Sequence, residues 1–150
     1  MFKKQILFIA VLALVSCHQK KAAKTPGEAT PLKISGTAIK EVIIDNTIDL
    51  TNSGAMYTID SAHIMGDVLS VFVNYSGGCK EHTWDAYSNG MFAKSLPPKI
   101  YVQLKHINND DMCRQLINEE LKFNITKLKN ASTKSVKVIV GEKELSYLYK

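Results

Sequence analysis

The chain lacks an apolar stretch long enough to cross a membrane as a helix. Its N-terminal apolar run, from Gln5 to Val15, covers eleven residues, whereas a helix that spans a bilayer needs roughly 20. We therefore exclude a transmembrane anchor.

Blocks of positive charge are lacking too, because the lysines after residue 16 never stand more than two together. Nucleic-acid binding requires basic residues gathered on one face, so we expect no nucleic-acid partner.

The chain also lacks a recognisable catalytic motif. Ser76 and His82 could act as nucleophile and base, but no Gly-x-Ser-x-Gly turn surrounds the serine and no acid stands at a predictable place to orient the histidine. Asp110-Asp111 are adjacent, so a strand or turn points them apart rather than together as an acid–base pair. Glu119-Glu120 is interpreted as a solvated pair. We predict that the protein is not an enzyme.

Cysteine is scarce, and the first of the three cysteines lies in an informative place. Lys3-Lys4 precede the apolar run, and Leu14-Val15-Ser16-Cys17 closes it. A basic segment, a short apolar segment and a cleavage site are the parts of a secretory signal peptide. In this arrangement the chain resembles bacterial lipoproteins, whose lipobox places a cysteine after leucine, a variable residue and a small residue. A secreted protein with an incidental cysteine is the alternative.

This resemblance implies that residues 1–16 are removed and that acylated Cys17 anchors the mature protein in a lipid bilayer. Residues 17–31 follow as a flexible tether, since they are polar, contain Pro and Gly and carry no periodic apolar positions. Known lipoproteins use the residues after the lipidated cysteine as sorting signals. His18-Gln19 contains no aspartate of the inner-membrane-retention type, and no acidic export cluster follows. The resemblance therefore implies the periplasmic face of the outer membrane in the cell envelope, with cell-surface display second.

Residues 32–150 carry the pattern of a single β domain. Apolar residues alternate with other residues in five segments, as the side chains of half-buried strands do. The alternating apolar positions are Leu69, Val71, Val73 and Tyr75; Ile100, Val102 and Leu104; Leu121, Phe123 and Ile125; Val136, Val138 and Val140; and Leu145, Tyr147 and Tyr149. Together with Ile39–Ile44 and Tyr57–Met65, they predict seven or eight strands.

Turn residues separate the predicted strands at short intervals. Gly66-Asp67 suits a two-residue hairpin turn, and Pro97-Pro98 ends a ladder because proline donates no backbone hydrogen bond. Residues 110–120 are expected to form one short helix or helical turn, capped by Asp110 or Asp111. The predicted fold class is all-β, an antiparallel two-sheet sandwich, of which the immunoglobulin-like arrangement is one form. A small closed barrel is the alternative.

The other two cysteines form a pair once Cys17 is assigned to lipid. An even number of thiols in an oxidising compartment favours pairing, so we predict a Cys79–Cys113 disulfide. It would close a loop of about 34 residues and contribute roughly 3–4 kcal/mol in the chain-entropy model. Gly77-Gly78 lets the backbone turn sharply ahead of the first of these cysteines.

A metal site is the competing interpretation of the same region. Cys79, His82, His106 and Cys113 offer two thiols and two imidazoles, which suit zinc, or copper if the thiols stay reduced. His106 continues the apolar face of the strand before it, and His82 is in phase with Trp84, so both imidazoles are expected near the core. The spacing matches no compact zinc motif, and a disulfide would consume both thiolates. A weaker metal site of His82 and His106 alone, beside an intact disulfide, is a second alternative. The third is a structural role without metal, in which each histidine donates to a backbone carbonyl near the bridge.

The same segment carries a second resemblance. Ser76-Gly77-Gly78-Cys79-x-x-His82, followed by Leu104-x-His106 and Asp111-x-Cys113, is similar to a pattern in small secreted bacterial proteins of unknown function. This resemblance implies no activity and no cofactor. We therefore predict a membrane-anchored envelope lipoprotein that acts as a binding or scaffold module for an envelope protein or glycan. A metal-binding envelope protein is the alternative.

Overall fold

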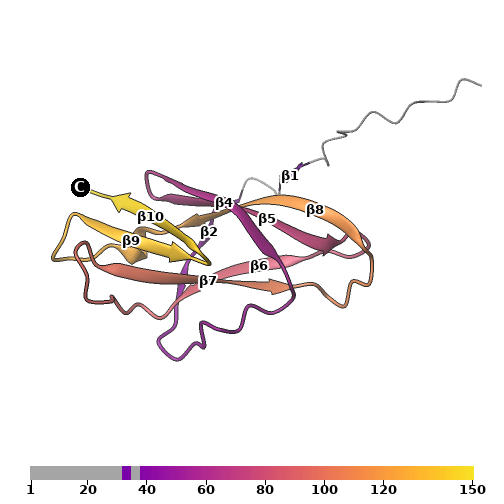
Figure 1. Ribbon diagram of the computed structural model, residues 1–150, viewed down its shortest axis with the longest axis horizontal. Coiled ribbons are helices and arrows are strands. Elements are labelled where there is room, and N and C mark those ends of the chain that lie inside the picture. Colours follow the sequence, from indigo (N-terminus) through magenta and orange to yellow (C-terminus); the bar gives the residue numbers. More distant parts are fainter. Residues whose placement is uncertain (1–31, 35–37) are drawn as a thin grey trace, which may run out of the picture.

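The computed structural model describes residues 32–34 and 38–150, and almost all of their regular structure is β-strand (Figure 1). The predicted signal peptide, the lipidation site Cys17 and the tether lie outside the described residues. In chain order the strands are β1 (Leu32–Ile34), β2 (Lys40–Glu41), β3 (Ile43–Ile44), β4 (Thr58–Met65), β5 (Val68–Gly77), β6 (Thr83–Ser88), β7 (Lys99–Ile107), β8 (Gln115–Asn124), β9 (Ser135–Val140) and β10 (Lys143–Leu148). Within this part of the chain, no helix is long and apolar enough to cross a membrane.

The strands form two packed sheets, which confirms the predicted all-β sandwich (Figure 1). One sheet has the order β1-β8-β5-β4, with β2 also paired to β8, and the other has the order β10-β9-β7-β6-β3. Four pairs are antiparallel. However, β1 and β2 run parallel to β8, β3 runs parallel to β6, and β7 runs parallel to β9. The sheets are therefore mixed rather than purely antiparallel.

The segment Lys40–Ile44 belongs to both sheets. Its first two residues pair with β8, its last two pair with β6, and the fully buried Val42 crosses between them. The single strand predicted over Ile39–Ile44 is therefore two short strands, because one extended ladder cannot follow two sheets that lie about 10 Å apart.

The core lies between the sheets, where the predicted alternation places it. Its centre is the β5–β8 ladder, in which the two ten-residue strands pair along their whole length. The predicted inward residues of four groups are buried: Leu69, Val71, Val73, Tyr75, Ile100, Val102, Leu104, Leu121, Phe123, Ile125, Val136, Val138 and Val140. In the last group only Tyr147 is fully buried, while Leu145 and Tyr149 pack at the margin of the core. The predicted hairpin turn at Gly66-Asp67 is also present.

The helix predicted at residues 110–120 is not formed. Residues 108–111 instead make a tight turn, closed by a backbone hydrogen bond of 3.0 Å. Its central residues Asn109 and Asp110 have positive φ angles of 51° and 55°, the pattern of a type I′ turn that asparagine and aspartate tolerate. The chain then enters β8, because pairing with β5 and inward burial outweigh local helix propensity. Within the described residues, the one helical element is a 3₁₀ turn at Thr126–Leu128.

Candidate functional site

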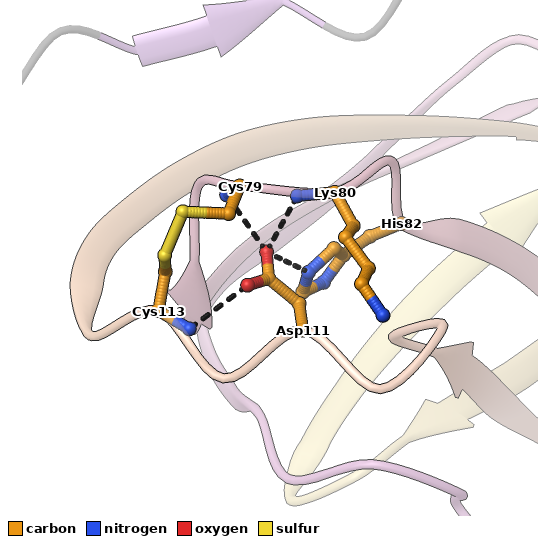
Figure 2. Close-up of a disulfide and its surroundings, with 5 residues drawn as sticks. All are labelled: Cys79, Lys80, His82, Asp111 and Cys113. Carbon is orange, nitrogen blue, oxygen red and sulfur yellow. Dashed lines mark hydrogen bonds and ion pairs between the residues drawn. A yellow bond between two sulfur atoms is a disulfide. The ribbon is translucent and has the colours of Figure 1, made fainter.

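The predicted disulfide joins two loops at the end of the sandwich opposite the C terminus (Figures 1 and 2). The first loop, residues 78–82, connects β5 to β6, and the second, residues 108–114, connects β7 to β8. We call them the disulfide-linked loops. Cys79 and Cys113 form the bond, with their Cα atoms 5.8 Å apart. The disulfide prediction is therefore confirmed, and it brings together segments that are 34 residues apart in sequence.

A buried carboxylate links the same two loops a second time (Figure 2). Asp111 Oδ2 accepts the backbone N–H groups of Cys79 and Lys80, both at 2.9 Å, and Oδ1 accepts the N–H of Cys113 at 2.9 Å. His82 Nε2 lies 3.2 Å from Oδ2, and the Asp111 side chain is fully shielded from solvent. These donors, led by the N–H of Cys113, hold the pKa of the Asp111 carboxyl well below its usual range. Asp111 is therefore a fixed anion.

The two histidines of the predicted metal site contact each other. His82 and His106 are both buried, which confirms the inward orientation expected from their phase. His82 Nδ1 and His106 Nε2 are 2.8 Å apart. Because Asp111 is ionised, His82 Nε2 must carry a hydrogen, and one further hydrogen lies between the two rings. The result is a hydrogen-bonded chain from Asp111 through His82 to His106.

His106 ends this chain in its neutral form. When His106 donates its Nε2–H to His82, its Nδ1 is left as a bare acceptor. That atom is the one fully buried side-chain nitrogen or oxygen without a hydrogen-bond partner in residues 38–150. Burial lowers the pKa of the His106 imidazole, and the neighbouring His82 lowers it further. A neutral His106 accounts for both observations.

A second buried carboxylate lies beside the histidines. Glu119 accepts hydrogen bonds from the Tyr75 hydroxyl at 2.6 Å and from Trp84 Nε1 at 3.2 Å. The Trp84 ring stacks on the His106 ring with a centroid distance of 3.9 Å. Burial raises the pKa of the Tyr75 hydroxyl, and its bond to Glu119 raises it further. This polar cluster is thus held by aromatic rings from both sheets.

Two residues of the cluster were missed by the sequence analysis. Asp111 was expected to cap a helix, and no sequence pattern reveals that its carboxylate reaches backbone groups 31 and 32 residues away. Glu119 was expected to be solvated, but only 2% of it is exposed. A signal for Glu119 does exist, because it is in phase with the inward residues Leu121 and Phe123 of the same strand.

The glycine pair before Cys79 makes room for the cluster. A Cβ atom at Gly77 would lie 2.6 Å from two atoms of the His82 ring and 3.2 Å from Asp111 Oδ2. Gly78 has a φ of +113°, in the region that favours glycine. The predicted sharp turn is confirmed, and Gly77 has the additional role of admitting the His82 ring.

The hydrolase arrangement of Ser76 and His82 is not assembled. Both nitrogens of the His82 ring are already within hydrogen-bond distance of Asp111 and His106. No hydrogen bond joins Ser76 to His82 among the described residues, and Ser76 is exposed whereas His82 is buried. A general base needs a ring nitrogen that can reach the nucleophile, and His82 has none to offer.

The four predicted metal ligands do not converge either. Cys79 and Cys113 are bonded to each other, so they present no thiolates. His82 Nδ1 and His106 Nε2 lie close enough to share a hydrogen. Within the described ranges, the one group of three potential ligand atoms within 4.8 Å consists of Cys79, Asp111 and Cys113. Two of those atoms are the sulfurs of the disulfide.

Comparison with known proteins finds solved structures of similar fold but assigns the chain to no family. No family model matches the chain, and no curated protein matches it. A NigD-like immunity protein from Bacteroides caccae has a similar structure, with a TM-score of 0.50 and 13% identity over 73% of this chain and 58% of that chain. A protein of unknown function, DUF1344, from Bacteroides vulgatus gives a TM-score of 0.49 and 17% identity over 81% of this chain and 58% of that chain. The chain thus spans less than two thirds of the length of either neighbour, and the similarity concerns the fold alone.

Proposed function

We propose that this protein is a lipid-anchored envelope protein whose sandwich domain binds another protein through the disulfide-linked loops. The observation that carries the proposal is the double fastening of these loops, by the Cys79–Cys113 bond and by the Asp111 carboxylate. Loops that are fixed before a partner arrives lose little conformational entropy on binding. Binding loops on a rigid scaffold are a common arrangement in β-sandwich domains.

The outward side chains of the loops suit a protein partner. Lys80, Glu81 and Arg114 are exposed and carry charges of both signs, and Met112 is 87% exposed. Methionine and arginine are enriched in protein interfaces over the rest of the surface, and Lys80 and Glu81 suit the polar rim of such an interface. The inward side chains are meanwhile hydrogen-bonded to one another and have no reactive group to present. The arrangement therefore supports recognition rather than catalysis.

The comparison with solved structures is compatible with such a function. One neighbour of similar fold is described as a NigD-like immunity protein, but that likeness concerns the fold, and the proposal rests on the disulfide-linked loops. A photo-crosslinking residue at Met112, in cells that express the full chain, tests this directly. The matched control is the same residue at Met65, which is 75% exposed at the β4–β5 turn, away from the disulfide-linked loops.

A discrete adduct of one partner at position 112, absent at position 65, supports the proposal. The adduct should also be lost when Lys80 and Arg114 are both changed to glutamate, because their charges lie on the surface that meets the partner. Adducts that are absent at position 112, or identical at the two positions, would contradict a binding site at the disulfide-linked loops.

The anchoring part of the proposal rests on the lipobox and has its own test. The mass of the intact mature protein should correspond to a chain that begins at Cys17 and carries acyl groups. A Cys17→Ala variant should keep its signal peptide and lose the acyl mass. A mature chain that begins elsewhere, or an unmodified Cys17, would refute the lipoprotein assignment.

A further inference from the structure

A groove lies on the side of the sandwich where β4 begins. It is bordered by residues 50–53, by the middle of β7 and by the turn between β9 and β10. Its volume is about 540 Å³, within the range of pockets that hold small ligands. None of the polar cluster around Asp111 lines it, so the groove is separate from the site proposed above.

The lining of the groove mixes polar and apolar groups and has no dominant charge. Thr51, Ser53 and Thr58 contribute hydroxyl groups, and Gln103 contributes an amide. The two charged residues at the turn, Glu142 and Lys143, have opposite signs. A site with hydroxyls, an amide and balanced charge matches a neutral ligand that is rich in hydroxyl groups, since strongly charged ligands require an excess of the opposite charge.

The floor of the groove is held in a fixed geometry. Gln103 Nε2 donates to the Tyr57 hydroxyl at 3.2 Å and to the Leu104 carbonyl at 2.9 Å, and Tyr57 donates to the same carbonyl at 3.0 Å. Because both amide hydrogens are committed, the amide oxygen of Gln103 remains as an acceptor for a ligand hydroxyl. The Tyr57 ring also packs edge-on against Trp84, with centroids 5.1 Å apart.

An exposed aromatic ring continues the groove along β7. Tyr101 precedes Gln103 on the same outward face of the strand and is 44% exposed. A smaller hollow of about 110 Å³ beside Tyr101 shares Leu50, Gln103 and Gly141 with the groove. The loop that carries Leu50 is stiffened by Thr51, whose N–H and hydroxyl both donate to Asp49 Oδ1, at 2.8 and 2.6 Å. An aromatic face therefore stands beside fixed polar groups.

We infer that this groove binds a neutral glycan. The apolar face of a sugar ring packs on Tyr101, and its hydroxyl groups bond to the Gln103 amide oxygen and to the hydroxyls of Thr51 and Ser53. Aromatic rings give large contact area at small entropic cost, while the polar groups fix the orientation of the ring. This binding is independent of the protein recognition proposed for the disulfide-linked loops.

Titration calorimetry of the purified mature protein in detergent tests the inference. The probes are three neutral oligosaccharides, maltohexaose, mannohexaose and chitohexaose, and one charged oligosaccharide, hexagalacturonate. We expect at least one neutral probe to bind. We expect Tyr101→Ala to weaken that binding by about tenfold or more, and Tyr101→Phe to retain it because the ring remains.

Lys105→Ala serves as the matched control, because Lys105 is exposed on the same face of β7 and lines neither the groove nor the smaller hollow beside Tyr101. It should bind the neutral probe as the unaltered protein does. Equal urea midpoints for the Tyr101 variants establish that they are folded. The inference is overturned if no neutral probe binds at millimolar concentration, if Tyr101→Ala leaves binding unchanged, or if hexagalacturonate binds in preference to every neutral probe.

Discussion

Replacing Gly77 by alanine should destabilise the domain mainly through a steric conflict with the His82 ring. The added methyl group would lie 2.6 Å from Cε1 and Nε2 of the His82 ring, whereas carbon atoms in contact are about 3.5–4.0 Å apart. The φ angle of Gly77 is not in the left-handed region, so the backbone itself accommodates alanine. The ring must move, and it is held at both nitrogens by Asp111 and His106.

The magnitude follows from these contacts. Overpacking of a well-filled site costs about 1–3 kcal/mol, and the loss of one hydrogen bond of His82 adds about 0.5–1.5 kcal/mol. Where the backbone angles suit alanine, a glycine-to-alanine change stabilises the folded protein by about 0.4–1 kcal/mol, because it lowers the conformational entropy of the unfolded chain. The free energy of unfolding should therefore fall by about 0.5–4 kcal/mol, measured by urea denaturation of the disulfide-bonded protein.

A double-mutant cycle separates this conflict from a general intolerance of alanine at position 77. In a His82→Ala background the methyl group of Gly77→Ala no longer meets the ring, so its cost should fall to the smaller cost of the remaining 3.2 Å contact with Asp111 Oδ2. The coupling energy between the two changes is then most of the cost of the single Gly77→Ala change. If Gly77→Ala costs the same in both backgrounds, the reasoning from the His82 ring is wrong.

Three further measurements probe the same cluster. The free energy of unfolding should fall as the pH is lowered. The unfolded chain takes up protons at the ordinary pKa values of 6.5 for histidine and 3.8 for aspartate, whereas folded His106 and Asp111 have lowered pKa values and resist protonation. Urea midpoints that stay constant from neutral pH down through both values would contradict this. Asp111→Asn should speed reduction of the disulfide by dithiothreitol, measured by the release of thiols. The aspartate charge lies within 4.8 Å of both sulfurs and disfavours the thiolates that reduction creates. The control is Asp110→Asn at the exposed neighbouring position, whose disulfide should be reduced at the unaltered rate. Glu119→Gln should lower the free energy of unfolding by about 1–3 kcal/mol, since Tyr75 and Trp84 lose a charged acceptor. The control is Glu142→Gln at an exposed position, which should change the free energy of unfolding by less than about 0.5 kcal/mol.

The sequence predicts the faces of the strands better than their partners. Alternation in β5, β7, β8 and β9 identifies the core because the pleat of any strand sends successive side chains to opposite faces. Nothing local predicts that β7 and β9 run parallel, since the pairing depends on where the intervening chain returns. The Lys40–Ile44 segment was predicted as one strand for the same reason. Its two halves, Lys40-Glu41 and Ile43-Ile44, differ in composition, but neither composition shows which sheet that half joins.

The polar cluster was predictable in part. The phase of His82 and His106 relative to their apolar neighbours correctly placed both rings in the interior. Their mutual contact depends on the register of β6 against β7, which sets Trp84 opposite His106 and is visible only in the folded chain. Asp111 is harder still, because its role comes from the turn at residues 108–111 that directs its carboxylate toward the other loop.

The stacking of Trp84 on His106 gives the domain an intrinsic optical probe. Trp84 is the chain's single tryptophan, and its ring lies parallel to the imidazole at 3.9 Å with an interplanar angle of 1°. A protonated imidazole quenches an adjacent indole by accepting an electron from its excited state, whereas a neutral imidazole does so weakly. The emission intensity of the folded protein therefore reads out the protonation of a buried ring, without any label, from a position that solvent quenchers reach poorly.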